Sequence, residues 1–243
     1  MKVLIISSCS GEKKFSIANS ALAKDLDDFE LRMKKEEELS KYKIKAREMF
    51  ISSQNKFIEE GLKILEQNEY IVEYSFISSG YGYITSEDYV IPYDVNLSVM
   101  SAYDNEKRGD FFKINEELCF SAKNYDLIFF LLSHEYLRTL NLPLKNVSEK
   151  TKQIFFLTKS DSKVINDFKN IIRMDLGNEE ITLLGVKASE LKGYIFKLIA
   201  NESKEYNVFE EIYKNPKHID TIILKNKKNI EKEIVQMNLF DNI

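Results

Sequence analysis

The sequence predicts an α/β protein, a three-layer sandwich around a central, mostly parallel sheet of four to five strands, followed by a C-terminal appendage. Two observations favour this class. Short apolar, β-rich runs alternate with helix-length stretches along the 243 residues, which is the pattern of βαβ units. The runs are apolar throughout, as in parallel strands that helices cover on both faces.

Five runs are predicted to be the strands, and they contain the β-branched and aromatic residues that strands prefer. In chain order they cover residues 3–7, 71–77, 127–132, 153–157 and, as the weakest, 171–174. Each is followed by polar residues. Because parallel strands all end at one edge of a sheet, the polar loops after them are the first place to look for a ligand site.

The segments between the strands predict helices. Apolar residues recur near a helical period in 42–67, 106–123 and 188–200, which predicts helices that pack on the sheet. The segment of about 18–40 is rich in lysine and glutamate, and predicts a solvated helix or a mobile insertion. We therefore divide the chain into an α/β domain over 1–200 and an appendage with a tail over 201–243.

Composition excludes several classes of protein. A net charge of −4 argues against a protein that coats nucleic acid non-specifically. Two cysteines and two histidines without ligand spacing predict neither a disulfide framework nor a metal site, and we expect no cofactor. No run of eighteen apolar residues and no export signal is found, so we predict a cytoplasmic protein without a membrane partner.

The loop after the first predicted strand carries small residues and two cations. Ser8, Cys9 and Ser10 can bring backbone N–H groups and small side chains to a substrate, and Lys13 and Lys14 can bind phosphate. The glycine spacing fits neither a Walker loop nor a dinucleotide fingerprint. The alternative is a polar turn with two exposed lysines.

The stretch "SSGYGYITSEDYVIPYD" after the second predicted strand is the most unusual in the chain. Gly80 and Gly82 allow positive φ and close approach of a ligand, whereas Tyr81, Tyr83 and Tyr93 offer flat faces for stacking. These properties predict a nucleobase-binding loop. Alternatively, the tyrosines fill the edge of the core.

Asp94 closes the same stretch. Pro92 restricts the backbone just before it, so the carboxylate is held by local geometry, and we predict that Asp94 is catalytic. The alternative is that Asp94 caps the helix or turn that begins near Val95.

The loops after the third and fourth predicted strands add further candidates. His134 follows the most apolar strand and is predicted to be a second catalytic residue, although histidines in this position often only begin a helix. Arg138 and Lys159 are predicted to bind phosphate or DNA. We expect Lys13, Tyr81 and Asp94 to converge with His134 around one cavity large enough for a heterocycle.

Two of these loops carry a resemblance to known families. The chain resembles bacterial domains related to the peroxide-stress protein YaaA and, more distantly, the core domain of archaeosine synthases. The matching positions are Cys9, Ser10, Lys13, Ser79, Gly80, Tyr81, Gly82, Pro92, Tyr93 and Asp94. The resemblance implies a fold like that of uracil-DNA glycosylase, which holds a flipped base at the carboxyl edge of a parallel sheet. Residues 1–200 would then be a base-binding domain.

The last residues suggest a partner. Gln236, Leu239 and Phe240 form a Gln-x-x-Leu-Phe pattern, which resembles the peptide that bacterial replication and repair proteins insert into the sliding clamp. The alternative is that Leu239 and Phe240 dock on this protein's own surface.

These observations favour a DNA glycosylase that excises a modified base, and we expect a role in defence against phages with modified DNA. Asp94 would stabilise the cationic sugar or activate water, and Tyr81 or Tyr83 would stack on the extruded base. Two alternatives stay open: a YaaA-like DNA-binding stress protein without turnover, and a transferase that modifies tRNA bases.

Overall fold

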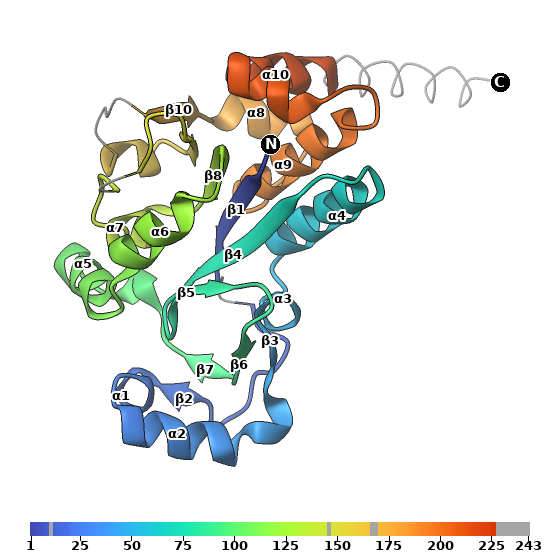
Figure 1. The fold of residues 1–243 in the computed structure, drawn as a ribbon. Coiled ribbons are helices and arrows are strands. Elements are labelled where there is room, and N and C mark those ends of the chain that lie inside the picture. The colour runs from blue at the N-terminus through green and yellow to red at the C-terminus, as the bar shows by residue number, and fades with distance from the viewer. Residues whose placement is uncertain (10–11, 145–146, 166–169, 227–243) are drawn as a thin grey trace.

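The computed structural model describes residues 1–9, 12–144, 147–165 and 170–226, and in these ranges the chain folds around a six-stranded sheet (Figure 1). The strand order is β10-β9-β8-β1-β4-β5, and all neighbours are parallel except β4 and β5. In chain order the strands are β1 Val3–Ser8, β4 Val72–Ser78, β5 Gly82–Thr85, β8 Leu127–Leu131, β9 Lys152–Leu157 and β10 Ile171–Asp175.

The predicted α/β class and its five parallel strands are confirmed, whereas the expected four to five strands become six. The extra strand β5 comes from the stretch that was predicted to be a ligand loop. Gly82 has φ of +75°, which lets the chain reverse tightly, so that Ile84 pairs antiparallel with Phe76. Part of the suspected loop is therefore an edge strand.

Within the described residues, four shorter strands lie beyond the main sheet. β2 (Ala21–Leu22) pairs parallel with β7 (Tyr93–Asp94), and β3 (Ile44–Lys45) pairs antiparallel with β6 (Tyr89–Val90). The first pair joins the insertion to the end of the tyrosine-rich stretch, and the second joins the residues that follow the insertion to it. Figure 1 shows these pairs beside the carboxyl ends of β1 and β4.

The order of the parallel strands creates a switch point between β1 and β8. The chain moves from β1 to β4 on one side, returns to β8 on the other side of β1, and continues to β9 and β10. Numbered along the chain, the parallel strands have the order 2-1-3-4-5 of flavodoxin-like doubly wound sheets. In such sheets the crevice at the switch point is where ligands bind.

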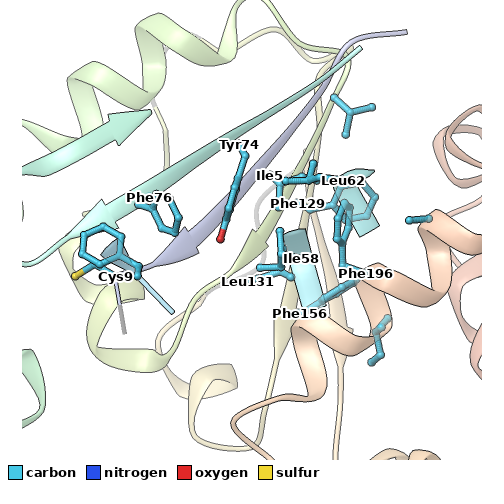
Figure 2. Packing of buried hydrophobic residues seen from close by; sticks show 14 of the residues in the cluster. Ile5, Cys9, Ile58, Leu62, Tyr74, Phe76, Phe129, Leu131, Phe156 and Phe196 are labelled. Atoms are coloured by element: carbon cyan, nitrogen blue, oxygen red, sulfur yellow. The ribbon is translucent and has the colours of Figure 1, made fainter. Parts of the chain in front are cut away.

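Helices cover both faces of the sheet, because successive strand residues point to opposite sides. Ile5 and Phe129 lie in one apolar cluster, and Leu4 and Phe130 lie in the other. The first face packs on α4 (Ser53–Gln67), α8 (Asn178–Leu184), α9 (Leu191–Glu202) and α10 (Val208–Lys214), as Figure 2 shows in part. The second face packs on α6 (Ile114–Ala122) and α7 (His134–Thr139), and α5 (Ala102–Phe111) lies against α7.

Two predicted helices are interrupted. The helix expected over 42–67 begins only at Ser53, because Ile44 and Lys45 pair with β6 and the short α3 (Ala46–Met49) follows. Ser52 caps α4, its Oγ accepting a hydrogen bond from the Asn55 backbone N–H at 3.3 Å. The helix expected over 106–123 divides into α5 and α6 at Lys113, whose φ is +50°.

The charged insertion packs on the tyrosine-rich stretch through α1 (Ala23–Leu26) and α2 (Phe29–Glu38). Asp27 forms two hydrogen bonds with the Arg108 guanidinium, at 3.0 and 2.9 Å, and Arg108 also donates to the Ser79 carbonyl oxygen. The Arg32 guanidinium lies 4.4 Å from the centre of the Tyr81 ring. The insertion is therefore tied to the carboxyl edge of the sheet.

Part of the predicted appendage belongs to the main core. Phe209 on α10 lies against Phe129 of β8, with ring centres 6.1 Å apart, and Ile219 and Ile222 in the helical stretch 218–226 are buried in the same cluster. The clamp-like tail residues Gln236, Leu239 and Phe240 lie outside the described residues. None of the described helices combines the length and apolar character that crossing a bilayer requires.

Candidate functional site

A cleft of about 750 Å³ opens at the carboxyl ends of β1, β8 and β9. Ser8 ends β1, Ser133 follows β8 and Thr158 follows β9, and all three line the cleft. This is the place where a doubly wound sheet binds its ligand. The cleft is large enough for a nucleoside-sized molecule.

Gln54 in the first turn of α4 spans the switch point. Its amide Nε2 donates to Ser7 Oγ on β1 and to the Leu131 carbonyl oxygen on β8, each at 3.0 Å. Ser7 Oγ donates in turn to Asn55 Oδ1 at 2.8 Å, and Asn55 Nδ2 donates to the Ser8 carbonyl oxygen at 3.4 Å. Two neighbouring residues of α4 therefore fix the diverging strand ends that form the cleft wall.

The N-terminal ends of α4 and α9 both line the cleft. Ser52 and Ser53 contribute from α4, and Ser189 lies just before α9. The two helices approach closely at Gly193, where an added Cβ would lie 2.3 Å from the Gln54 carbonyl oxygen. The positive ends of two helix dipoles and several hydroxyl groups thus face one space.

Glu135 and His134 lie side by side on the cleft wall at the start of α7. Ser133 Oγ donates a hydrogen bond to Glu135 Oε2 at 2.6 Å, and His134 Nδ1 lies 3.3 Å from the same oxygen. The Glu135 side chain is about one-fifth exposed and that of His134 about two-fifths. A half-buried carboxylate beside an imidazole can exchange protons with a bound substrate.

A buried ion pair lines part of the cleft. Lys192 Nζ lies 2.7 Å from Asp161 Oδ2 and donates to the Leu132 carbonyl oxygen, and the two side chains are only 6% and 3% exposed. Asp161 Oδ2 also accepts hydrogen bonds from the backbone N–H and the hydroxyl of Thr158, both at 2.7 Å. Burial lowers the pKa of Lys192, although Asp161 opposes the shift.

The tyrosines expected to stack on a base pack mainly against the protein itself. Tyr93 is buried, its OH lies 2.8 Å from Ser78 Oγ, and Lys13 Nζ lies 4.4 Å from its ring centre. Tyr81 is buried between Tyr93 and Arg32, and burial raises its pKa. Neither ring lines the cleft, so the expected base-stacking surface is not present there.

Tyr83 and Gly80 also differ from expectation. Tyr83 lies on the other face of the sheet, where its OH is 2.9 Å from Ser121 Oγ. Gly80 does not have positive φ. It is needed for space, since an added Cβ would lie 2.7 Å from Leu26 Cδ1, and this close approach is to the protein's own side chain rather than to a ligand. Gly82 has the expected positive φ.

Asp94 is exposed on β7 and does not line the cleft. Its carboxylate makes no hydrogen bond or ion pair with any described residue. The proposed alternative, that Asp94 caps the following turn, is also wrong, because Asn96 is the capping residue and its Oδ1 accepts from the Ser98 backbone N–H at 2.9 Å. The expected convergence of Lys13, Tyr81 and Asp94 with His134 around one cavity is therefore not found.

Cys9 connects the tyrosine-rich stretch to the cleft. It is 1% exposed, and its Sγ lies 3.4 Å from Ser79 Oγ and 3.3 Å from the OH of Tyr136, a residue that lines the cleft. The first two loops and the start of α7 therefore lie against one another, although the sequence predicted that they would meet around a cavity. They meet through packed side chains and not around an open space.

The predicted phosphate-binding residues lie in different surroundings. Lys14 is exposed, and Arg138 lies 3.4 Å from Glu106 on α5. Lys159 is exposed between Thr158 and Ser160, which both line the cleft, so it belongs to the rim. Ser10 lies outside the described residues.

Sequence reasoning identified Ser8 and His134 as site residues but did not single out other residues of the cleft, among them Gln54, Glu135, Asp161 and Lys192. A signal existed for two of them, because Glu135 and Asp161 follow the ends of predicted strands. Gln54 and Lys192 lie within predicted helices, and only the close packing of α4 and α9 brings them to the sheet edge.

The comparisons with known proteins do not extend this description. No protein family model matches the chain, and no curated protein matches it.

Proposed function

We propose that the protein binds a nucleobase-bearing substrate in the switch-point cleft and cleaves its N-glycosidic bond, with DNA that contains a modified base as the substrate. The observation that carries this proposal is the half-buried Glu135 carboxylate, which Ser133 and His134 orient toward a nucleoside-sized space. The fold like that of uracil-DNA glycosylase, implied by the sequence resemblance, remains part of the proposal. In this proposal Glu135 takes the catalytic role that the sequence predicted for Asp94.

Cleavage of an N-glycosidic bond is helped by stabilisation of charge on the sugar and by protonation of the base, and residues on this wall of the cleft can provide both. Positive charge develops on the sugar in the transition state, and the Glu135 carboxylate can stabilise it at close range. The departing base needs a proton, and the imidazole of His134, which lines the cleft beside Glu135, is placed to deliver one. The adjacent positions of the two side chains suit these complementary roles.

The rim of the cleft is consistent with a nucleic-acid substrate of limited contact area. Lys159 and Lys187 are exposed cations there, whereas Glu12 and Glu190 contribute negative charge. A mixed rim favours binding at one extruded nucleotide over broad, salt-dependent contact with a phosphate backbone. The polar, hydroxyl-rich lining fits the hydrogen-bonding edges of a base.

The proposal is tested by incubating the protein with duplex and single-stranded oligonucleotides that carry normal or hypermodified bases, and measuring released base by mass spectrometry. Substituting Glu135→Gln preserves size but removes the charge, and we expect about a 100-fold or greater loss of release. Asp94→Asn is the matched control and should leave the rate unchanged.

Other outcomes redirect the assignment. Release that depends on Asp94 and not on Glu135 would move the chemistry to the insertion side of the sheet edge. Specific binding without release, unaffected by Glu135→Gln, would support the YaaA-like DNA-binding alternative. Activity on tRNA bases alone, detected by nucleoside analysis, would support the transferase alternative. If the protein neither releases a base from any oligonucleotide of the panel nor binds any of them, the proposal is wrong.

A further inference from the structure

Lys192 is a nucleophilic side chain for which the proposed mechanism has so far no use. It is buried, yet it lines the cleft together with its partner Asp161. Glu135 lies near enough to favour the charged form of Lys192, so all three groups share one electrostatic environment. An amine, a proton acceptor and the proposed catalytic carboxylate therefore line the same cleft.

A purely structural role explains this arrangement poorly. Burying a lysine and an aspartate carries a desolvation penalty that is often as large as their attraction, and apolar residues of similar size can do equally well. The pair also does not need to face the cleft to join β9 to α9. Desolvation activates a lysine as an amine nucleophile, and Asp161 lies within hydrogen-bond distance of Nζ to accept its proton.

We propose that Lys192 is the nucleophile that displaces the base, forming a covalent imine with C1′ of the deoxyribose. This inference rests on the proposed glycosidic cleavage and specifies what attacks the sugar. Asp161 is the proton acceptor of the pair, and Glu135 stabilises charge on the sugar. The substrate is a 2′-deoxynucleotide, because the proposed substrate is DNA, and the intermediate is an open-chain sugar attached to the enzyme.

The step balances as follows. Asp161 takes one proton from the Lys192 ammonium, and the freed lone pair of Nζ bonds to C1′ while the C1′–N bond breaks with its electrons on the base. His134 donates a proton to the departing base, as in the proposed mechanism, and regains one when water hydrolyses the iminium, while Asp161 returns its proton to the Lys192 amine. A second amine proton passes to O4′ as the C1′–O4′ bond breaks and Nζ forms a double bond to C1′. Water then hydrolyses the iminium, which regenerates Lys192 and leaves an abasic aldehyde.

The inference can be tested without base excision, because an abasic site already presents the aldehyde. Full-length protein is mixed with an oligonucleotide that contains one abasic site, sodium cyanoborohydride is added, and the adduct is digested and mapped by mass spectrometry. We expect hydride reduction to leave a stable secondary amine at Lys192. Mapping on the wild-type chain keeps the test valid even where a Lys192 variant fails to fold.

Matched variants complete the design. Lys192→Met should abolish the adduct, and Lys63→Met, which removes an exposed lysine of α4 that does not line the cleft, should retain it. Lys192→Arg keeps the positive charge beside Asp161 but cannot form the imine, so its adduct should also be lost. An adduct at other lysines, or none at all, overturns the inference.

Base release is measured in parallel, so that the two proposals fail separately. Release from a modified oligonucleotide without trapping at Lys192 leaves glycosidic cleavage standing with water as the nucleophile. Trapping at Lys192 with no release from any oligonucleotide retains the imine chemistry and removes the excision of a base.

Discussion

The cleft and the tyrosine-rich stretch lie at the same edge of the sheet, yet the side chains of the stretch pack on one another whereas those of the cleft face open space. In residues 79–94 the rings of Tyr81 and Tyr93 pack on each other, with centres 5.7 Å apart, and Arg32 and Lys13 lie over them. In the cleft, the polar side chains of Glu135 and His134 face open space. Aromatic residues at the sheet edge where a ligand is expected can thus stabilise the fold by packing on one another and not bind the ligand.

Removing the Tyr93 ring tests this contrast most strongly. Tyr93→Ala deletes a side chain that is only 2% exposed and in contact with Phe50 and Tyr81, and we expect it to lower the free energy of unfolding by about 3–5 kcal/mol. Urea unfolding followed by circular dichroism measures the change.

Ser53→Ala in the cleft is the control for Tyr93→Ala, and it should shift stability by no more than about 0.5 kcal/mol. A stable Tyr93→Ala protein with impaired ligand binding would reverse the contrast and restore the stretch as a binding surface.

The close approach of α9 to α4 provides the second test, since it builds the cleft from residues far apart in the chain. Gly193→Ala places a Cβ 2.3 Å from the Gln54 carbonyl oxygen, so the helices must separate. We expect a loss of about 1–3 kcal/mol in stability together with weaker substrate binding.

Gly185→Ala serves as the comparison for Gly193→Ala. Its Cβ would meet no atom within 4 Å, and only its positive φ of +64° opposes the change. It should lower stability without affecting binding. Equal effects of both variants on binding would show that helix spacing does not shape the cleft.

A third test concerns the attachment of the insertion to the tyrosine-rich stretch. Asp27→Asn removes the ion pair with Arg108, whose side chain is 10% exposed and also donates to the Ser79 carbonyl oxygen. We expect about 1 kcal/mol of destabilisation because Asp27 itself is partly exposed. Hydrogen exchange of α1 and α2 should increase, while α7 and α9 stay unchanged. Faster exchange throughout the chain would contradict this local role.

The smallest effect is a pH dependence at Glu36. Burial alone would raise the pKa of its carboxyl, but hydrogen bonds from Lys43 and Arg32 outweigh burial and hold the pKa below its ordinary value of 4.5. A lowered folded pKa contributes stability that is present above the unfolded value and is lost as the pH falls through the folded value.

Glu36→Gln should therefore have a lower Tm than the wild type at neutral pH, and the difference in Tm should disappear at acidic pH. Measured between about pH 6 and pH 3, Tm should fall less steeply in the variant than in the wild type. Parallel Tm curves for the two proteins would show that the ion pairs of Glu36 add no stability.

The same contrast explains how far the sequence alone could lead. Strand positions follow from continuous apolar runs, a local property, so all five parallel strands were predictable. Whether a tyrosine faces solvent or its neighbours depends on contacts across the fold, as with Tyr81 beneath Arg32 of the insertion. Glu135 followed a predicted strand, whereas Lys192 reaches the cleft only through the packing of α9.

The central claim is that ligand binds at the switch-point cleft and not on the tyrosine-rich stretch. Hydrogen exchange with mass spectrometry, with and without an oligonucleotide carrying a stable abasic analogue, tests it most directly. We predict protection confined to residues 52–54, 133–136 and 188–192, with 82–94 unchanged. Protection of 82–94 with no change at those three segments would contradict the account.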